Sequence, residues 1–371
     1  MDKSKRQLKV MFSGGGTGGS LTPLLVVARK LRQYDNNIDL IFVGTSNGPE
    51  KKLVLDYNLP GKSVVFKTIP AGKWRRYLSI KNLIDVFKII IAFFASICLL
   101  RREKPGVVIS AGGFVSVPLA WAAYILNIPV IIHQQDVRPG LANRLMAKTA
   151  KIITVSFEKS LKDYGKKARW IGNPAPDMPS SDKLLEVKKK YRLSENKPIL
   201  MITGGGTGSE MINRLIWEKA GELVAYFQVF HLTGKGKAPS GDVRVRVNSL
   251  KDYHWQEIVN SQDALCLLAA ASLVVSRCGL ATLTEMCALR KSAILIPIPS
   301  SHQEDNAQVF SDNQAAIVLE QNNLTSQKFK DEIMSLFSDQ KKMLVLSTNI
   351  DKIMRKEAAS KMVEIIKSLL K

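Results

Sequence analysis

The sequence predicts an α/β protein with two Rossmann-like, doubly wound domains that face each other across a cleft. Apolar runs of strand length alternate with helical patterns along the whole chain, which is typical of parallel sheets. A strand, a glycine-rich loop and a helix follow one another twice, in LKVMFSGGGTGGS from Leu8 and in PILMITGGGTGSE from Pro198. With 371 residues and 46% hydrophobic composition, the chain can bury two cores.

The first half begins with the strand-like VMFS, followed by a helix expected from Pro23 to Arg32 and by the strand-like IDLIFVGT. The later runs VVIS, VIIH and IITVS continue the same alternation. The N-terminus, MDKSKRQLKV, passes from charged residues straight into a strand-like segment and has no secretory pattern. We therefore expect a cytoplasmic location.

A segment rich in Pro and Ser, NPAPDMPSSDK, interrupts the pattern near Asn173 and predicts a domain linker. The second half then restarts with PILMITGGGTG and continues through FQVFHLTG, SLVVS and SAILIPIP. No strand follows the helical pattern of Ile350 to Lys371. We expect an N-terminal domain over 1–175, a second domain over 176–345, and a C-terminal helix over 346–371 that packs back on the N-terminal domain.

The net charge of +22, from 54 basic and 32 acidic residues, indicates an anionic partner. Basic residues flank an apolar segment, Ile80 to Leu100, whose uninterrupted core from Ile89 is too short to cross a bilayer. Together with Lys73-Trp74-Arg75-Arg76 and Arg101-Arg102, it predicts a helix on an anionic membrane surface rather than a nucleic-acid site. A core helix of the first domain is the alternative. Four cysteines without metal-ligand spacing indicate a reducing compartment.

In the first glycine loop, Gly14, Gly16 and Gly19 match the dinucleotide pattern G-x-G-x-x-G. However, the next strand ends in Val43-Gly44-Thr45, without the acid that holds the ribose in NAD-binding domains. Glycines at a helix N-terminus still offer amide donors to a phosphate. The alternative is a tight turn without a ligand.

The second loop, Gly204 to Gly208, has no Gly-Lys-Ser or Gly-Lys-Thr, which argues against a P-loop kinase. Two such loops on similar domains predict phosphate-binding helix ends on both walls of a cleft. That arrangement suits a pyrophosphate donor and a phosphorylated acceptor.

Three polar segments could carry further chemistry. A helix expected from about Leu280 places Thr282 and Glu285 on one face, where the carboxylate can bind ribose hydroxyls or stay a solvated glutamate. The polar loop over 299–307 could bind sugar hydroxyls. At the end of VIIH, His133 or Asp136 could act as a general base, or His133 is a core residue and Asp136 a cap.

Taken together, these segments resemble the MurG family over nearly the whole length. That family transfers N-acetylglucosamine from its UDP form to the lipid-linked muramyl-pentapeptide precursor of peptidoglycan. The matching landmarks, in order, are GGGTGGSLTP, SAGGFVSVPLAWAA, IPVIIHQQDVRPGLANRLMAKTA, GNP, GGGTG, SRCGLATLTE and HQEDNA.

The resemblance implies a B-type glycosyltransferase fold, inversion at the anomeric carbon, and no metal or other cofactor. It implies a peripheral protein on the cytoplasmic face of the membrane, which the segment Ile80 to Leu100 would contact. Glu285 would hold the ribose. The other residues implied for the donor are Gly205, Gly206, Thr207, Gly208, Leu280, Ala281, Thr282, His302, Gln303 and Asn306. Those implied for the acceptor and its diphosphate are Thr17, Gly18, Gly19, Gln134 and Asn173.

The chain also departs from the family at several positions. Ser20 stands where the family has His, Gln134 where it has Glu, and Asp136 where it has Asn. Pro176 replaces an arginine, and Gly206-Thr207 replaces Ser-Gln. Asp136 is therefore our preferred base candidate, and the loop amides from Gly205 to Gly208 would stabilise the departing UDP.

Two alternatives to this function stay open. The chain could use another lipid-linked or glycolipid acceptor, or it could be a non-catalytic, membrane-associated protein that binds UDP-sugars. An oxidoreductase is disfavoured because the ribose acid after Val43 is missing.

Overall fold

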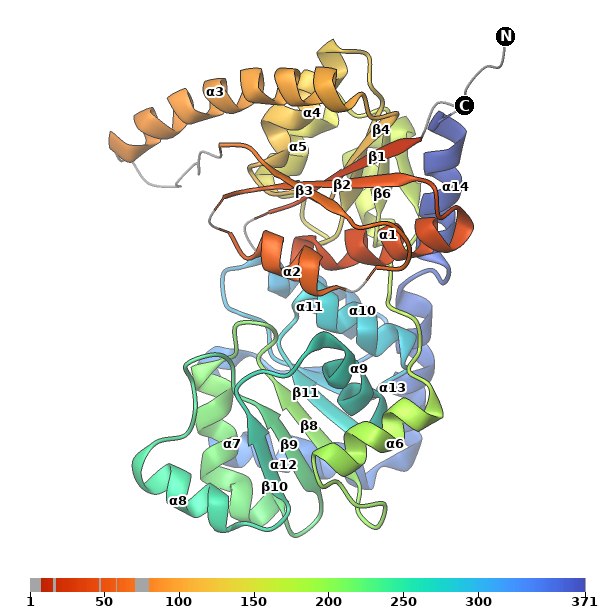
Figure 1. Ribbon diagram of the computed structural model, residues 1–371. Helices are drawn as coiled ribbons and strands as arrows, with labels where there is room; N and C mark the ends of the chain where they lie inside the picture. Colours follow the sequence, from red (N-terminus) through yellow and green to blue (C-terminus); the bar gives the residue numbers. More distant parts are fainter. Residues whose placement is uncertain (1–7, 16–17, 47, 58, 71–79, 371) are drawn as a thin grey trace. The chain divides into compact units, whose positions relative to one another are not determined.

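A computed structural model shows that the chain forms two compact units (Figure 1). The structure describes residues 8–15, 18–46, 48–57, 59–70 and 80–370, with side chains in the last range from Phe87 onward. Unit 1 comprises Met1–Pro176 and Arg355–Lys371, and unit 2 comprises Asp177–Met354.

Unit 1 is built on a seven-stranded parallel sheet. Its strands are β1 (Lys9–Ser13), β2 (Asp39–Gly44), β3 (Val65–Thr68), β4 (Val107–Ser110), β5 (Val130–Gln134), β6 (Ile152–Val155) and β7 (Ala168–Trp170). They lie in the order β3-β2-β1-β4-β5-β6-β7, and each neighbouring pair is parallel. The chain thus builds outward from β1 on one side and resumes at β4 on the other. This is the predicted doubly wound topology, with its switch point between β1 and β4.

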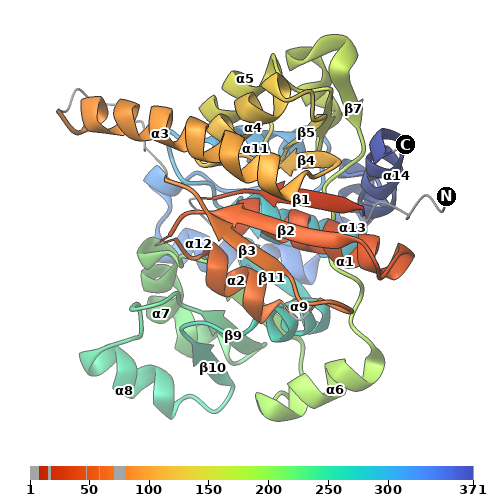
Figure 2. The same ribbon diagram turned by 45° about the horizontal axis from the view of Figure 1, so that its top comes forward.

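Helices cover both faces of this sheet (Figures 1 and 2). They are α1 (Thr22–Tyr34), α2 (Glu50–Asp56), α3 (Ile80–Glu103), α4 (Ser116–Ile125), α5 (Leu141–Ala147) and α14 (Ala358–Leu370), with 3-10 turns η1 (Gly18–Ser20), η2 (Glu158–Asp163) and η3 (Gly165–Lys167). Val10 and Phe12 of β1 pack in one core with α1 and α14. Met11 between them packs in the other core with α3 and α4. Burial on both faces explains the continuous apolar run of this strand.

The chain returns to unit 1 near its end. Gly172 has a φ of +85°, and a Cβ there would lie 2.3 Å from the carbonyl oxygen of Arg355. The guanidinium of Arg355 lies over the ring of Trp170, 4.2 Å from its centroid. The segment 346–371, for which the sequence predicts one helix, contains the end of α13 (Gln340–Ile353) in unit 2 and all of α14 in unit 1.

Unit 2 repeats the architecture with six parallel strands in the order β10-β9-β8-β11-β12-β13. The strands are β8 (Ile199–Thr203), β9 (Gln228–Leu232), β10 (Tyr253–Gln256), β11 (Leu273–Ser276), β12 (Ala293–Leu295) and β13 (Ile317–Val318). The helices are α6 (Ser181–Lys190), α7 (Glu210–Leu223), α8 (Gly241–Ser249), α9 (Ser261–Ala270), α10 (Leu280–Ala288), α11 (His302–Asp312), α12 (Ser326–Ser338) and α13, with the 3-10 turn η4 (Gln321–Asn323).

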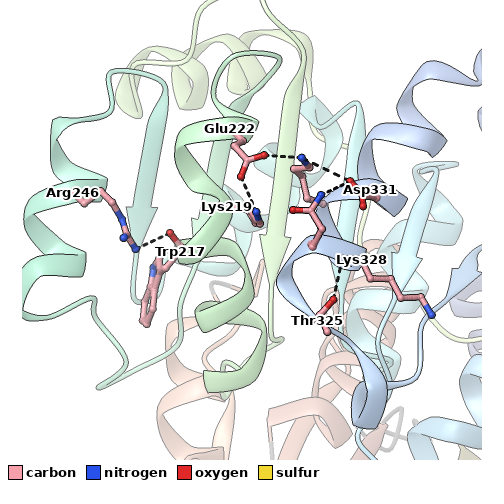
Figure 3. Close-up of polar contacts among 9 residues, drawn as sticks. Trp217, Lys219, Glu222, Arg246, Thr325, Lys328 and Asp331 are labelled. Atoms are coloured by element: carbon pink, nitrogen blue, oxygen red, sulfur yellow. Dashed lines mark hydrogen bonds and ion pairs between the residues drawn. The ribbon is translucent and has the colours of Figure 1, made fainter.

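One core of unit 2 joins β8 to α7 and α12, and a surface network reinforces that contact (Figure 3). Glu222 of α7 pairs with Lys219, at 2.8 Å, and with Lys330 of α12, at 2.6 Å. These two hydrogen bonds lower the pKa of Glu222 to about 2. The backbone N–H of Lys328 donates to Thr325 Oγ1, which caps α12.

Candidate functional site

The second glycine loop follows β8 and leads into α7, as the sequence predicts. Gly204 and Gly208 are packed tightly, because a Cβ on either would lie within 2.5 Å of backbone atoms. Gly205 and Gly206 face open space, with no atom within 4 Å of an added Cβ. The tight glycines hold the loop in place, and the open ones leave its backbone accessible to a ligand.

The N-terminus of α7 lies directly behind this loop. Ser209 caps the helix by accepting a hydrogen bond from the backbone N–H of Ile212 at 3.4 Å. Helix N-termini carry a partial positive charge and favour phosphates. The backbone of this loop and the start of α7 therefore suit a phosphate, as the sequence predicts.

Helix α10 carries the predicted ribose acid. It begins at Leu280, which is buried, while Ala281, Thr282 and Glu285 are half-buried. Desolvation raises the pKa of Glu285 to about 7. A carboxylate that is costly to ionise in the free protein gains stability when hydroxyl groups donate to it.

The predicted sugar-binding residues on α11 also brace the start of α10. Gln303 Oε1 accepts from the backbone N–H groups of Cys278, at 3.2 Å, and Ile298, at 3.3 Å. The amide of Asn306, which is buried, donates to the carbonyl of Cys278 at 3.2 Å. His302 is exposed at the first position of the helix. The Gln303 Nε2 group is not used in this brace and can donate to a sugar hydroxyl.

Arg277 connects these elements through hydrogen bonds, and it is not among the site residues predicted from the sequence. Its guanidinium is buried and donates to the carbonyls of Ile296 and Pro297, both at 3.0 Å, to Ser209 Oγ at 2.8 Å, and to Gln321 Oε1 at 2.6 Å. Desolvation lowers its pKa. The available signal was a charged residue directly after the buried run LVVS and before a helix.

In unit 1, the structure decides between the two interpretations of His133. The ring is fully buried, with Nδ1 2.9 Å from Thr154 Oγ1 and Nε2 2.7 Å from Asn173 Oδ1. Desolvation lowers its pKa to about 4. His133 is therefore a neutral core residue, and Asn173 is buried as its partner.

Gln134 is buried beside it and organises the loop that follows β5. Its Nε2 donates to the carbonyls of Asp136, at 2.6 Å, and Arg138, at 3.3 Å. Its Oε1 accepts from Asn143 Nδ2, at 2.7 Å, and Tyr164 Oη, at 3.0 Å. Asp136 is half-buried in this loop.

The first glycine loop is held against the turn after β4. Gly113 has a φ of +93°, and a Cβ there would lie 2.5 Å from the carbonyl oxygen of Gly15. Thr17 lies outside the described residues; Gly18 and Ser20 are half-buried in η1, and Gly19 between them is exposed.

A buried carboxylate that the sequence did not indicate lies next to this loop. Glu50 is fully buried, and a Cβ on Gly15 would lie 2.9 Å from its Oε1. Thr45 Oγ1 donates to Glu50 Oε2 at 3.1 Å. No sequence pattern marks Glu50, because its burial results from the packing of α2.

Helix α3 contains the apolar segment and projects past the strands of unit 1 in both ribbon views (Figures 1 and 2). Phe87, Ile90, Ile91 and Phe94, spaced as neighbours on one helix face, are 48–61% exposed. Ala92 is buried, and Leu99 and Leu100 are buried in the core that includes α4. The basic cluster Lys73 to Arg76 lies outside the described residues.

Within the described part of the chain, no helix combines the length and apolarity needed to cross a bilayer. Nor do three or more His, Cys, Asp or Glu side chains gather there in a way that could hold a metal ion.

Comparison with protein families finds two matching domains. Residues 10–155 match the glycosyltransferase family 28 N-terminal domain, and residues 199–368 match the glycosyltransferase family 28 C-terminal domain.

Two curated relatives carry the same name, UDP-N-acetylglucosamine–N-acetylmuramyl-(pentapeptide) pyrophosphoryl-undecaprenol N-acetylglucosamine transferase. One, from Clostridium perfringens (strain SM101), is 35% identical over 347 residues, 91% of this chain and 93% of the relative. The other, from Thermoanaerobacter sp. (strain X514), is 31% identical and covers 98% of this chain and 100% of the relative.

Solved structures share the fold. MurG from Acinetobacter baumannii superposes with a TM-score of 0.73 at 22% identity, covering 97% of this chain and 99% of that one. A putative UDP-N-acetylglucosamine 2-epimerase from Listeria monocytogenes gives a TM-score of 0.71 at 13% identity, covering 98% and 96%.

Proposed function

Since the chain belongs to the MurG family within glycosyltransferase family 28, we propose that it transfers N-acetylglucosamine from UDP-N-acetylglucosamine to undecaprenyl-diphospho-muramyl-pentapeptide, a step of peptidoglycan synthesis. The observation that carries this proposal is identity of 31–35% with curated transferases over more than nine-tenths of the chain. The site residues of unit 2 suit the donor, and those of unit 1 include an acid that can act as a base.

The donor role of unit 2 rests on three features. The loop Gly205 to Gly208 and the N-terminus of α7 offer amide donors to the diphosphate. Glu285 accepts hydrogen bonds from the ribose hydroxyls, and Gln303 Nε2 donates a hydrogen bond to the sugar. Leu280, Ala281 and Thr282 line the first turn of α10 beside them.

Transfer needs a base and a stabilised leaving group. The acceptor hydroxyl attacks C1 of the sugar, the bond from C1 to the diphosphate oxygen breaks, and its electron pair leaves with UDP. We assign the hydroxyl proton to Asp136, because the buried, neutral His133 has no lone pair directed to a substrate. Gln134 keeps the backbone that carries Asp136 in place.

The lipid-linked acceptor is offered at a membrane, and the exposed stripe of α3 suits that surface. Phe87, Ile90, Ile91 and Phe94 present apolar side chains, and Arg101 near the end of the helix is exposed. Apolar contact combined with basic residues binds anionic bilayers. We place the protein at the cytoplasmic face as a peripheral enzyme.

Release of UDP from UDP-N-acetylglucosamine, measured with and without the lipid-linked acceptor, tests this function. We expect release that depends on the acceptor and is lost in Asp136→Asn, while UDP binding is kept. Binding of UDP-sugar without turnover in the wild-type protein would instead favour a non-catalytic binding protein. Release with a different lipid-linked or glycolipid acceptor only would overturn the acceptor assignment.

A further inference from the structure

The loop after β9 places a lysine beside the second glycine loop. Strands β8 and β9 are parallel neighbours, so the loops that follow them leave the same edge of the sheet. Gly208 and Gly234 are in backbone contact, since a Cβ on either would lie 2.5 Å from the Cα of the other. Both have positive φ, +68° and +97°, so the two loops are joined by glycines that no other residue can replace without strain.

Lys237 extends from this second loop onto the first. Its half-buried side chain donates from Nζ to the carbonyl oxygen of Gly208 at 3.3 Å. An ammonium has three N–H donors, so this bond leaves two for another acceptor. The neighbouring Gly205 and Gly206 border open space, where an anion bound by the loop amides would lie.

Arg277, which donates to Ser209 behind the loop, is committed to contacts within the protein. Arg277 is buried, and its two terminal nitrogens already make four hydrogen bonds to protein oxygens. The positive charge of Arg277 contributes to the local electrostatic potential, but its terminal N–H groups are used in hydrogen bonds that stabilise the fold. Lys237 is placed to contact a ligand directly.

We propose that Lys237 binds the diphosphate of the nucleotide-sugar donor and stabilises the UDP that departs. The inference rests on the proposed function. As the bond from C1 to the diphosphate oxygen breaks, its electron pair adds negative charge to the β-phosphate. The Lys237 ammonium neutralises part of this charge, while the proton of the acceptor hydroxyl passes to the base. A cation fixed beside developing charge lowers the barrier of the chemical step.

Inhibition of sugar transfer by UDP and by uridine, which lacks the phosphates, tests this assignment in the whole 371-residue chain. We compare wild type with Lys237→Met, Lys237→Arg and, as a matched control, Lys251→Met, which removes an exposed lysine before β10. We expect Lys237→Met to weaken UDP binding at least about tenfold and leave uridine binding within about twofold. Its kcat/KM should fall about 10²-fold, with Lys237→Arg recovering most of the loss.

Equal weakening of UDP and uridine, together with a lower melting temperature, would assign Lys237 a purely structural role and overturn the inference. Unchanged UDP binding and an unchanged kcat/KM in Lys237→Met would also overturn the inference, but would leave the transferase function intact. Failure of the wild-type protein to bind UDP or to transfer the sugar would overturn both proposals.

Discussion

Replacing Glu285 by glutamine is expected to stabilise the free protein while it weakens nucleotide binding. Desolvation raises the pKa of this carboxyl from 4.5 to about 7. Such a difference corresponds to about 3 kcal/mol between the two protonation states. Solvent screens part of this penalty at a half-buried side chain, so the value is an upper limit.

The sign of the effect depends on pH. Because the folded state binds the proton more tightly than the unfolded state, the wild-type protein loses stability as pH rises from 4.5 to about 7, and the loss stays constant above that range. Glu285→Gln has no charge to desolvate. The variant should match wild type at pH 4 and exceed it at pH 8, by roughly 2–4 °C in Tm for each kcal/mol gained.

Thermal unfolding at pH 4 and pH 8, together with UDP titrations, provides the assay. Wild-type affinity for UDP should rise as pH increases through about 7, because the ionised carboxylate of Glu285 accepts hydrogen bonds from the ribose hydroxyls. The variant should bind UDP more weakly at pH 8 and show a flatter pH profile. A variant that is less stable than wild type at pH 8, or that binds UDP equally well, would refute the role given to Glu285.

Three further predictions use features of both units. Gly208→Ala should destabilise unit 2 by more than about 2 kcal/mol in urea unfolding, because the new Cβ would lie 2.2 Å from the carbonyl oxygen of Thr233. Gly206→Ala should instead unfold at the same urea concentration as wild type, because its Cβ meets open space, but should bind UDP more weakly in a titration. Gln134→Glu would place a carboxylate oxygen against the carbonyl oxygen of Asp136, so the free energy of unfolding in urea should fall by about 1–3 kcal/mol. A variant as stable as wild type would contradict the assigned hydrogen bonds. Phe87→Ser combined with Phe94→Ser should reduce sedimentation with anionic vesicles without changing turnover of a water-soluble acceptor analogue; unchanged sedimentation would remove α3 as the membrane contact.

Much of the fold follows from local sequence signals. The alternation of strands and helices predicts both parallel sheets, and the helix start expected at about Leu280 agrees with α10. These features depend on the spacing of apolar residues and on glycine and capping residues, all of which are near one another in the sequence. The fold class was predictable for this reason.

The electrostatics of the site depend on contacts between distant residues. Arg277 reaches Ser209 across 68 positions, and His133 reaches Asn173 across 40. Whether His133 is a base or a core residue was open in the sequence, because only burial and these partners make it neutral. The elevated pKa of Glu285 likewise results from packing that no local pattern reveals.

The break between α13 and α14 shows the same limit. The apolar spacing over 350–371 is compatible with one helix, but Met354, which follows α13, has extended backbone at φ −119° and ψ 141°. Beyond it, Arg355 packs with Trp170 and Gly172 of unit 1. Tertiary contacts therefore determine where this helix ends.

The most direct test of the transferase function is incubation of the whole 371-residue chain with UDP-N-acetylglucosamine and undecaprenyl-diphospho-muramyl-pentapeptide, followed by mass spectrometry. We predict that the lipid-linked product gains one N-acetylglucosamine, with one UDP released for each sugar transferred. An unchanged acceptor in a sample whose protein is folded and binds UDP would contradict that function.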